Sequence, residues 1–121
     1  KAFEGCGFRR TTFAPGYGLA EATLKVCSTR KGAGPVFRAA DAAALERNRV
    51  VDLPTGQGNA RVLAGCGRPD FETFQTKVVI VNSETLRPCS EDEVGEVWVS
   101  GPGVAQGYWN KPVETEQVVV G

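Results

Sequence analysis

The alternation of apolar and polar positions predicts short strands over the second half of the chain. The run at residues 61–64 ends at a Gly-Cys-Gly turn, and the β-branched run at 77–81 predicts a strand buried on both faces. Val97 and Val99 alternate with their neighbours, which is typical of a half-buried strand. Several strands spaced by turns, with few helices, predict a mainly β (α+β) fold built as a small, irregular barrel or sandwich.

Short helices are predicted at three places. Residues 19–24 contain good helix formers and favour a helical turn, although Leu24 could equally begin a strand. Asp41 is placed to cap a helix over 42–47, because its carboxylate can accept an unpaired backbone N–H. Pro112 stands where a last helix would begin, a position at which its missing N–H costs nothing.

Length and charge narrow the classes of function. The 121 residues are enough for one domain or a piece of a larger one, and 14 basic residues balance 14 acidic residues. A neutral chain offers no electrostatic footprint for nucleic acid, and no apolar run is long enough for a membrane span. The absence of histidine excludes Ser-His and Cys-His nucleophile pairs and His-ligated zinc.

The four cysteines do not form a metal-binding pattern. Cys6, Cys27, Cys66 and Cys89 are widely spaced and contain no Cys-x-x-Cys pair, which speaks against zinc. A disulfide framework would need an export signal, and the first residues contain no apolar signal region. We therefore expect four reduced thiols in or near a core.

A first candidate site lies at residues 16–21. Gly16 and Gly18 flank Tyr17, so a flat ligand could approach the backbone closely and stack on the ring. Glu21 offers hard oxygen atoms of the kind that hold Mg²⁺ together with phosphates. The alternative is a plain turn with Tyr17 in the core and Glu21 in solvent.

A second segment, residues 94–109, contains no nucleophile. It predicts a strand, a Gly-Pro-Gly turn and then an aromatic pair, Tyr108 and Trp109. Direct contact with a ligand and simple packing of two large rings both remain open at this point.

Together and in this order, the two segments resemble the adenylate-forming superfamily of acyl-CoA synthetases, nonribosomal adenylation domains and luciferases. That superfamily carries an aromatic-Gly-x-x-Glu motif, then Gly-Glu-(apolar)-x-(apolar)-x-Gly and Gly-Tyr, which stand here at 17–21, 95–101 and 107–108. The fatty acyl-AMP ligase branch is the closer match, through Gly-Leu-Ala-Glu-Ala-Thr-Leu at 18–24 and the run at 99–112. Ala20 replaces a Thr that contacts phosphate in most of the superfamily, so that contact must come from elsewhere.

The resemblance implies a domain organisation. Residues 1–27 would be a lead-in that carries the adenine and Mg²⁺ motif, and residues 60–121 a β-barrel-like subdomain of the family's AMP-binding N-terminal domain. Residues 28–59 resemble a branch-specific insertion that restrains the mobile C-terminal domain and disfavours thioester formation with CoA. The alternative for this segment is an ordinary surface loop.

The resemblance also implies roles for the first motif. Tyr17 would stack on adenine, while the backbone around Gly16, Gly18 and Leu19 would contact the nucleotide. Glu21 would be the catalytic carboxylate that helps to bind Mg²⁺ with the phosphates of ATP. Tyr108, in the second motif, would have a scaffold role only. The parent enzyme would activate a fatty acid as acyl-AMP in the cytoplasm and pass it to an acyl carrier protein, for lipid or polyketide synthesis.

The family's other catalytic parts are not found in this sequence. We find no phosphate-gripping loop ending in Lys, no Gly-Asp pair after the second motif, and no C-terminal domain with its Lys. We therefore expect an internal fragment that is inactive alone and needs the rest of the parent chain. Two alternatives are a non-catalytic interaction module derived from such a domain and an unrelated secreted β-domain.

Overall fold

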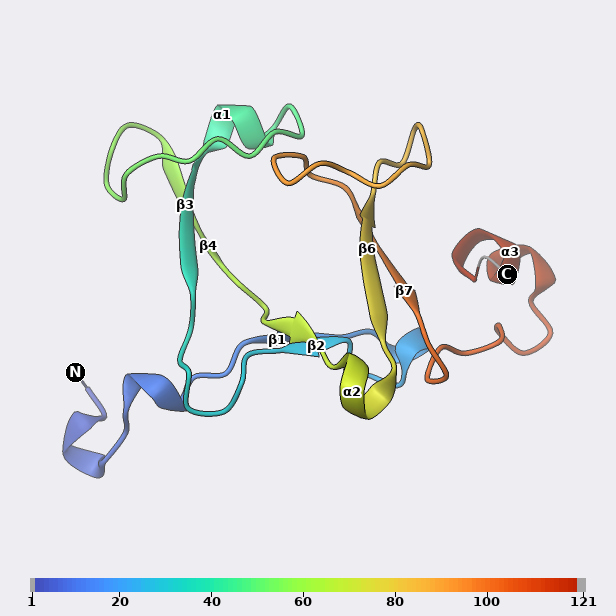
Figure 1. Cartoon of the computed structure of the whole chain (residues 1–121), viewed down its shortest axis with the longest axis horizontal. Coiled ribbons are helices and arrows are strands. Elements are labelled where there is room, and N and C mark those ends of the chain that lie inside the picture. Colours follow the sequence, from blue (N-terminus) through green and yellow to red (C-terminus); the bar gives the residue numbers. More distant parts are fainter. Residues whose placement is uncertain (1, 120–121) are drawn as a thin grey trace.

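Three small antiparallel sheets make up the computed structural model, which describes residues 2–119. Two long two-stranded ladders stand on a flat three-stranded layer, here called the base sheet, and together they give the open frame of Figure 1. The first ladder pairs β3 (Phe37–Asp41) with β4 (Ala60–Ala64), and the second pairs β6 (Lys77–Val81) with β7 (Glu96–Ser100). The base sheet has the order β1 (Gly16–Tyr17), β2 (Cys27–Ser28), β5 (Arg68–Pro69).

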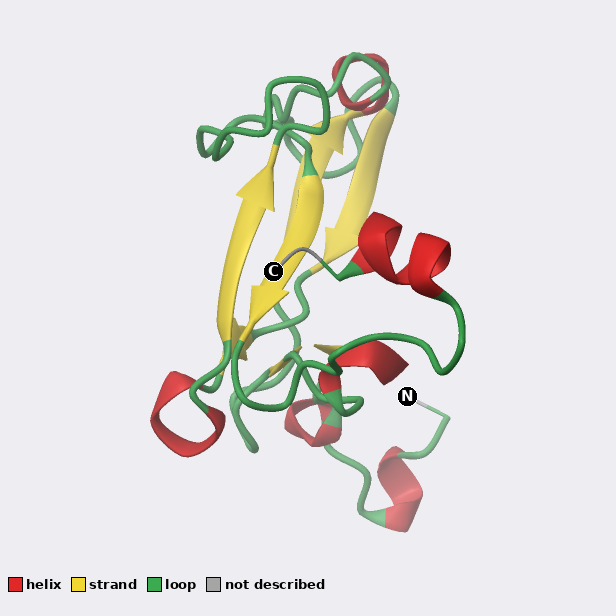
Figure 2. Ribbon diagram, turned by 90° about the vertical axis from the view of Figure 1, so that its right-hand side faces the viewer, coloured by secondary structure: helices red, strands yellow, loops and turns green. Residues whose placement is uncertain are grey.

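The helices are short and lie at the ends of the ladders or beside β7 (Figure 2). The α-helices are α1 (Ala42–Leu45), α2 (Phe71–Phe74) and α3 (Pro112–Val118), and single 3₁₀ turns occur at η1 (Glu4–Cys6), η2 (Arg10–Thr12) and η3 (Ala20–Ala22). Asp41 caps α1 as predicted, because its Oδ1 accepts the backbone N–H of Ala44 at 2.6 Å. Pro112 begins α3, also as predicted.

The helical turn predicted at 19–24 is present as the single 3₁₀ turn η3, and it does not continue beyond Ala22. After the single turn η3, Thr23 and Leu24 take left-handed backbone angles, with φ of 55° and 71°. That conformation is costly for residues with a Cβ, and it reverses the chain so that β2 can return beside β1. Tertiary pairing therefore overrides the local helix propensity here.

The first ladder crosses the boundary predicted between the insertion and the β-subdomain. β3 lies within residues 28–59 and β4 begins at Ala60, yet the two strands pair over five positions, from Phe37–Ala64 to Asp41–Ala60. The boundaries at 27/28 and 59/60 stay predictions about the family. In this chain, the two segments form one hairpin.

A polar contact joins the two ladders at the ends away from the base sheet. The Arg49 guanidinium forms ion pairs with Asp92 and, at 3.5 Å, with Glu93 in the loop that connects β6 to β7. Backbone hydrogen bonds from Val50 N to Asp92 O (2.7 Å) and from Val94 N to Asn48 O (3.0 Å) flank this pair. The loop after α1 is thus held against the second ladder.

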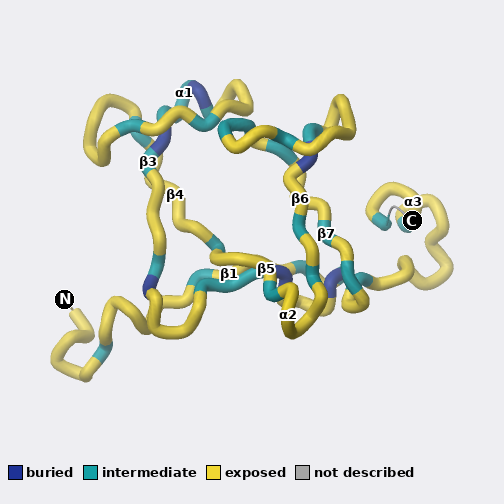
Figure 3. The backbone as a smooth tube through the Cα atoms, viewed as in Figure 1, coloured by how far each residue is buried: buried dark blue, intermediate teal, exposed yellow. Residues whose placement is uncertain are grey.

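Few side chains are buried among the described residues. The buried apolar residues lie at the corners of the frame, where ladders meet connecting segments, as Figure 3 shows: Ala22, Val26, Ala40, Ala44 and Val81. The chain exposes 9604 Å², whereas a compact monomer of this mass exposes about 6,300 Å². The ladders therefore have large uncovered apolar faces.

This exposure corrects one sequence prediction and qualifies another. Residues 77–81 form a strand, but the expectation of burial on both faces is wrong, since Val79 and Ile80 are 44% and 39% exposed. These two neighbouring residues point to opposite faces of the strand, so both faces are partly exposed in the described chain. The predicted mixture of strands and short helices is confirmed, although the three described sheets do not close into a barrel.

All four cysteines are free thiols. The expectation that they lie in or near a core is wrong for Cys6, which is exposed, whereas the other three are half-buried. Burial raises the pKa of the Cys27 thiol. Within residues 2–119 we find no helix with the length and apolar character needed to cross a bilayer.

The cap of α1 gives a stability prediction. Asp41→Ala should lower the free energy of unfolding by about 1 kcal/mol, because it leaves the N–H of the buried Ala44 without its acceptor. Urea denaturation measures the change. Asp41→Asn is the matched control, since the amide oxygen can still accept; equal stability of the alanine variant and the wild type would contradict the assigned cap.

Candidate functional site

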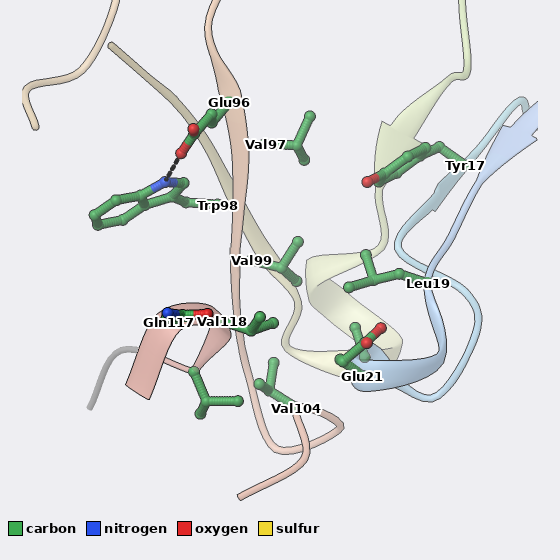
Figure 4. Close-up of a pocket in the computed structure, with 12 residues that line it drawn as sticks. Tyr17, Leu19, Glu21, Glu96, Val97, Trp98, Val99, Val104, Gln117 and Val118 are labelled. Atoms are coloured by element: carbon green, nitrogen blue, oxygen red, sulfur yellow. Dashed lines mark hydrogen bonds between the residues drawn. The ribbon is translucent and has the colours of Figure 1, made fainter. Parts of the chain in front are cut away.

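A cleft of about 460 Å³ lies where the first motif faces the second ladder (Figure 4). This volume falls within the range of pockets that hold small ligands. The lining residues come from β1 and η3, from β7 and the segment after it, and from α3: Tyr17, Leu19, Glu21, Ala22, Glu96, Val97, Trp98, Val99, Val104, Gln117, Val118 and Val119. Tyr17, Leu19 and Glu21 of the predicted site thus share one cavity.

Tyr17 presents an accessible ring to this cleft. The residue is 40% exposed, and its backbone is fixed because its carbonyl accepts the Val26 N–H at 3.1 Å. The antiparallel partner of Tyr17 is Cys27 of β2. The structure therefore agrees with an available aromatic face and not with the alternative of a ring sunk in the core.

The two glycines lie beside the ring but are required by packing within the chain. A Cβ on Gly18 would come within 1.4 Å of Leu24 O, and one on Gly16 within 3.0 Å of Cys27 O. Neither glycine lines the cleft. Their lack of a side chain lets β1 and the η3 turn pack closely against the returning chain, which is a different reason from the approach of a flat ligand.

Glu21 is held by a residue that the sequence did not connect with it. The Tyr108 hydroxyl donates a hydrogen bond to Glu21 Oε1 across 87 positions of sequence. This bond lowers the pKa of the Glu21 carboxyl and raises the pKa of the Tyr108 phenol. The carboxylate is thereby kept ionised and turned towards the cleft.

The segment that carries Tyr108 is fastened to the first motif by further hydrogen bonds. Ala105 N donates to Glu21 O at 2.7 Å, and the Thr23 hydroxyl donates to Gly103 O at 2.6 Å. The Gly-Pro-Gly turn after β7 therefore packs against the η3 turn. The two motifs, far apart in sequence, form one local structure.

The opposite wall of the cleft comes from β7. Val97 and Val99 point towards the side of Tyr17 and Leu19, whereas Trp98 points to the other side of the strand (Figure 4). The Trp98 indole N–H donates to Glu96 Oε2 at 3.2 Å. One wall is thus apolar, and Glu21 is the charged residue with which the first motif lines the cleft.

The carboxylate of Glu21 is suited to a metal ion that is bound mainly by the phosphates of a substrate. The described residues contain no cluster of three or more His, Cys, Asp or Glu side chains able to bind a metal alone. Mg²⁺ commonly takes one or two protein carboxylates and completes its shell with phosphates and water. Glu21 fits that pattern, because its carboxylate accepts from the Tyr108 hydroxyl and from its own backbone N–H, which leaves lone pairs for a cation.

The sequence predicted the first motif but not the hydrogen bond from Tyr108 that holds Glu21. Tyr108 was expected to be part of the scaffold only, and no spacing signal links it to Glu21. Leu19 was expected to act through its backbone, yet its side chain also lines the cleft. The roles of Gly16, Tyr17, Gly18, Leu19 and Glu21 toward a nucleotide stay predictions.

Comparisons with known proteins agree with the resemblance. The family model described as AMP-binding enzyme matches residues 1–109. The medium-chain-fatty-acid–acyl-carrier-protein ligase JamA of Moorena producens is 44% identical over 95% of this chain and 19% of its own length. The chain thus spans about a fifth of that relative.

Solved structures of fatty acid ligases are also similar to this chain. The fatty acid AMP ligase of Legionella pneumophila superposes with a TM-score of 0.86 at 37% identity, over 96% of this chain and 19% of the ligase. The fatty acyl-adenylate ligase of L. pneumophila in complex with acyl adenylate and pyrophosphate gives a TM-score of 0.84 at 38% identity, over 95% and 19%. On the match of the family model to most of its length, this chain belongs to the family of AMP-binding enzymes.

Proposed function

We propose that this chain supplies one wall of the adenylate site in a fatty acyl-AMP ligase. The observation that carries the proposal is that Tyr17 and Glu21 line a single cleft, with the ring accessible and the carboxylate oriented. The similarity to ligases that act on fatty acids supports the same reading. A non-catalytic module derived from the family is the second candidate, but it would have no need of an oriented, ionised Glu21.

The proposed reaction joins a fatty acid to AMP. A carboxylate oxygen of the fatty acid attacks the α-phosphorus of ATP, the bond to the β-phosphate oxygen breaks, and pyrophosphate leaves with the electron pair. A bound Mg²⁺ would neutralise charge on the phosphates. In this chain, Tyr17 would orient the adenine by stacking, the backbone at residues 16–19 would fix the nucleotide, and Glu21 would hold its cation.

We further propose that the product is passed to an acyl carrier protein. Support comes from the relative JamA, whose name states an acyl-carrier-protein acceptor. The four free thiols fit work in the reducing cytoplasm. The remaining catalytic groups would come from other parts of the enzyme, so we expect this chain alone to form no acyl-adenylate.

Glu21→Gln in the full-length enzyme should reduce acyl-adenylate formation about a hundredfold, because the neutral amide binds the cation far more weakly. Exchange of labelled pyrophosphate into ATP measures the step. Glu72→Gln is the matched control, since Glu72 does not line the cleft. Activity of the Glu21 variant near that of the control would remove Glu21 from the mechanism.

Tyr17→Ala should raise the KM for ATP about tenfold or more, because stacking of a base on an aromatic ring contributes about 1–3 kcal/mol. Tyr17→Phe keeps the ring and should retain most of the affinity. Steady-state kinetics with saturating fatty acid make the comparison. Equal losses in both variants would mean that the hydroxyl, and not the stacking face, is what matters.

We also propose that residues 28–59 restrain a mobile C-terminal domain and so disfavour CoA as acceptor. The support is structural continuity: this segment forms half of the first ladder and is tied to the second ladder through Arg49. A loop anchored at both ends can transmit restraint, whereas an ordinary surface loop cannot.

Arg49→Ala in the full-length enzyme should loosen this anchor and allow a detectable share of acyl-CoA among the products. Arg47→Ala is the matched control, because Arg47 makes no ion pair with the described residues. Chromatography of the products formed with CoA present gives the result. An unchanged product ratio in the Arg49 variant would count against the restraining role.

A further inference from the structure

We propose that Tyr108 is a positioning residue that holds the Glu21 carboxylate in its metal-binding orientation before ATP arrives. The inference rests on the proposed role of Glu21, and it assigns a function to the second motif beyond that of a scaffold. Tyr108 acts through Glu21 and needs no contact with the nucleotide.

The contact itself restricts a side chain that would otherwise move. Glu21 lies at the surface of the cleft, where a glutamate normally samples many rotamers. The Tyr108 hydroxyl donates to Glu21 Oε1, and the other hydrogen bond to the carboxylate among the described residues comes from the backbone of Glu21 itself. One oxygen is thus fixed, and the remaining lone pairs stay available for a cation.

Tyr108 is in turn fixed by the helix that follows it. The Tyr108 backbone N–H donates to Thr115 Oγ1 at 2.9 Å, and the Thr115 hydroxyl donates to Lys111 O at 2.7 Å. Gly107 has a φ of 148°, and a Cβ there would lie 2.5 Å from Thr115 Cγ2. The close packing of Gly107 on α3 therefore sets the direction in which the Tyr108 ring leaves the chain.

The backbone of Glu21 is fixed from the same segment. Ala105 N donates to Glu21 O, so that residues 105 and 108 hold the backbone and the side chain of one glutamate. A tyrosine has only two side-chain torsions to the ring, and it makes a rigid support. The binding groups are then ordered in advance, which lowers the cost of fixing them on binding.

The test measures cation affinity directly in the full-length enzyme. Mn²⁺ serves as the probe in the presence of α,β-methylene-ATP, which cannot transfer AMP to the fatty acid because a carbon replaces the bridging oxygen that would leave with pyrophosphate. Electron paramagnetic resonance measures the free ion. Tyr108→Phe keeps the ring and removes only the hydroxyl, and it should raise the dissociation constant of Mn²⁺ about tenfold. The melting temperature and the KM for fatty acid should stay unchanged, which a merely structural role would not give.

Two further variants separate this inference from the proposed function. Glu21→Gln should weaken Mn²⁺ binding, and adding Tyr108→Phe to it should cause no further loss, because both changes act on the same carboxylate. Glu114→Gln is the control. Within residues 2–119 this exposed acid pairs with Lys111 alone, and the variant should bind Mn²⁺ like the wild type.

The outcomes are distinguishable. If Glu21→Gln binds Mn²⁺ normally, the proposed role of Glu21 fails and the inference fails with it. If Glu21→Gln binds weakly but Tyr108→Phe binds normally, or if the two losses multiply in the double variant, the inference on Tyr108 is overturned while the proposed function stands.

Discussion

The cleft depends on the docking of the turn after β7 against the turn that follows β1. These elements belong to different sheets, and no strand pairing connects them. The bonds from Ala105 N to Glu21 O and from the Thr23 hydroxyl to Gly103 O set their relative position. Glu21 comes from the turn after β1, and Tyr108, which binds its carboxylate, comes from the segment after β7. The site therefore exists only while these two turns are in contact.

This dependence matters because the chain has little core of its own. Isolated two-stranded ladders are marginally stable in water, and here their apolar faces are largely exposed. A chain that spans about a fifth of its relatives can leave such faces for neighbouring parts of a larger enzyme to cover. Polar contacts between the two turns therefore set the geometry of the cleft. Its rigidity depends in addition on packing against surfaces that the described residues do not provide.

Sequence patterns predicted the strands, caps and helix starts that depend only on neighbouring residues in the chain. The strand predicted at 61–64, the Asp41 cap and the helix that begins at Pro112 follow from short apolar runs, turns and capping residues, and all three are present. Burial of the 77–81 strand was wrong, because an apolar run indicates that a face will be covered but not by which chain. The same limit applies to Tyr108, since no periodicity links residues that meet only through the packing of turns.

Strand pairing and ion pairs integrate residues 28–59 with the rest of the fold. β3 gives β4 its only strand partner within the described residues, so residues 60–64 could not form a ladder without it. From the end of this ladder, α1 and the Arg49 loop reach the connection between β6 and β7. The base sheet joins the ladders at one end, and the Arg49 loop joins them at the other. Movement of residues 28–59 would consequently be felt at the loop that leads into β7, the strand that forms the apolar wall opposite Tyr17.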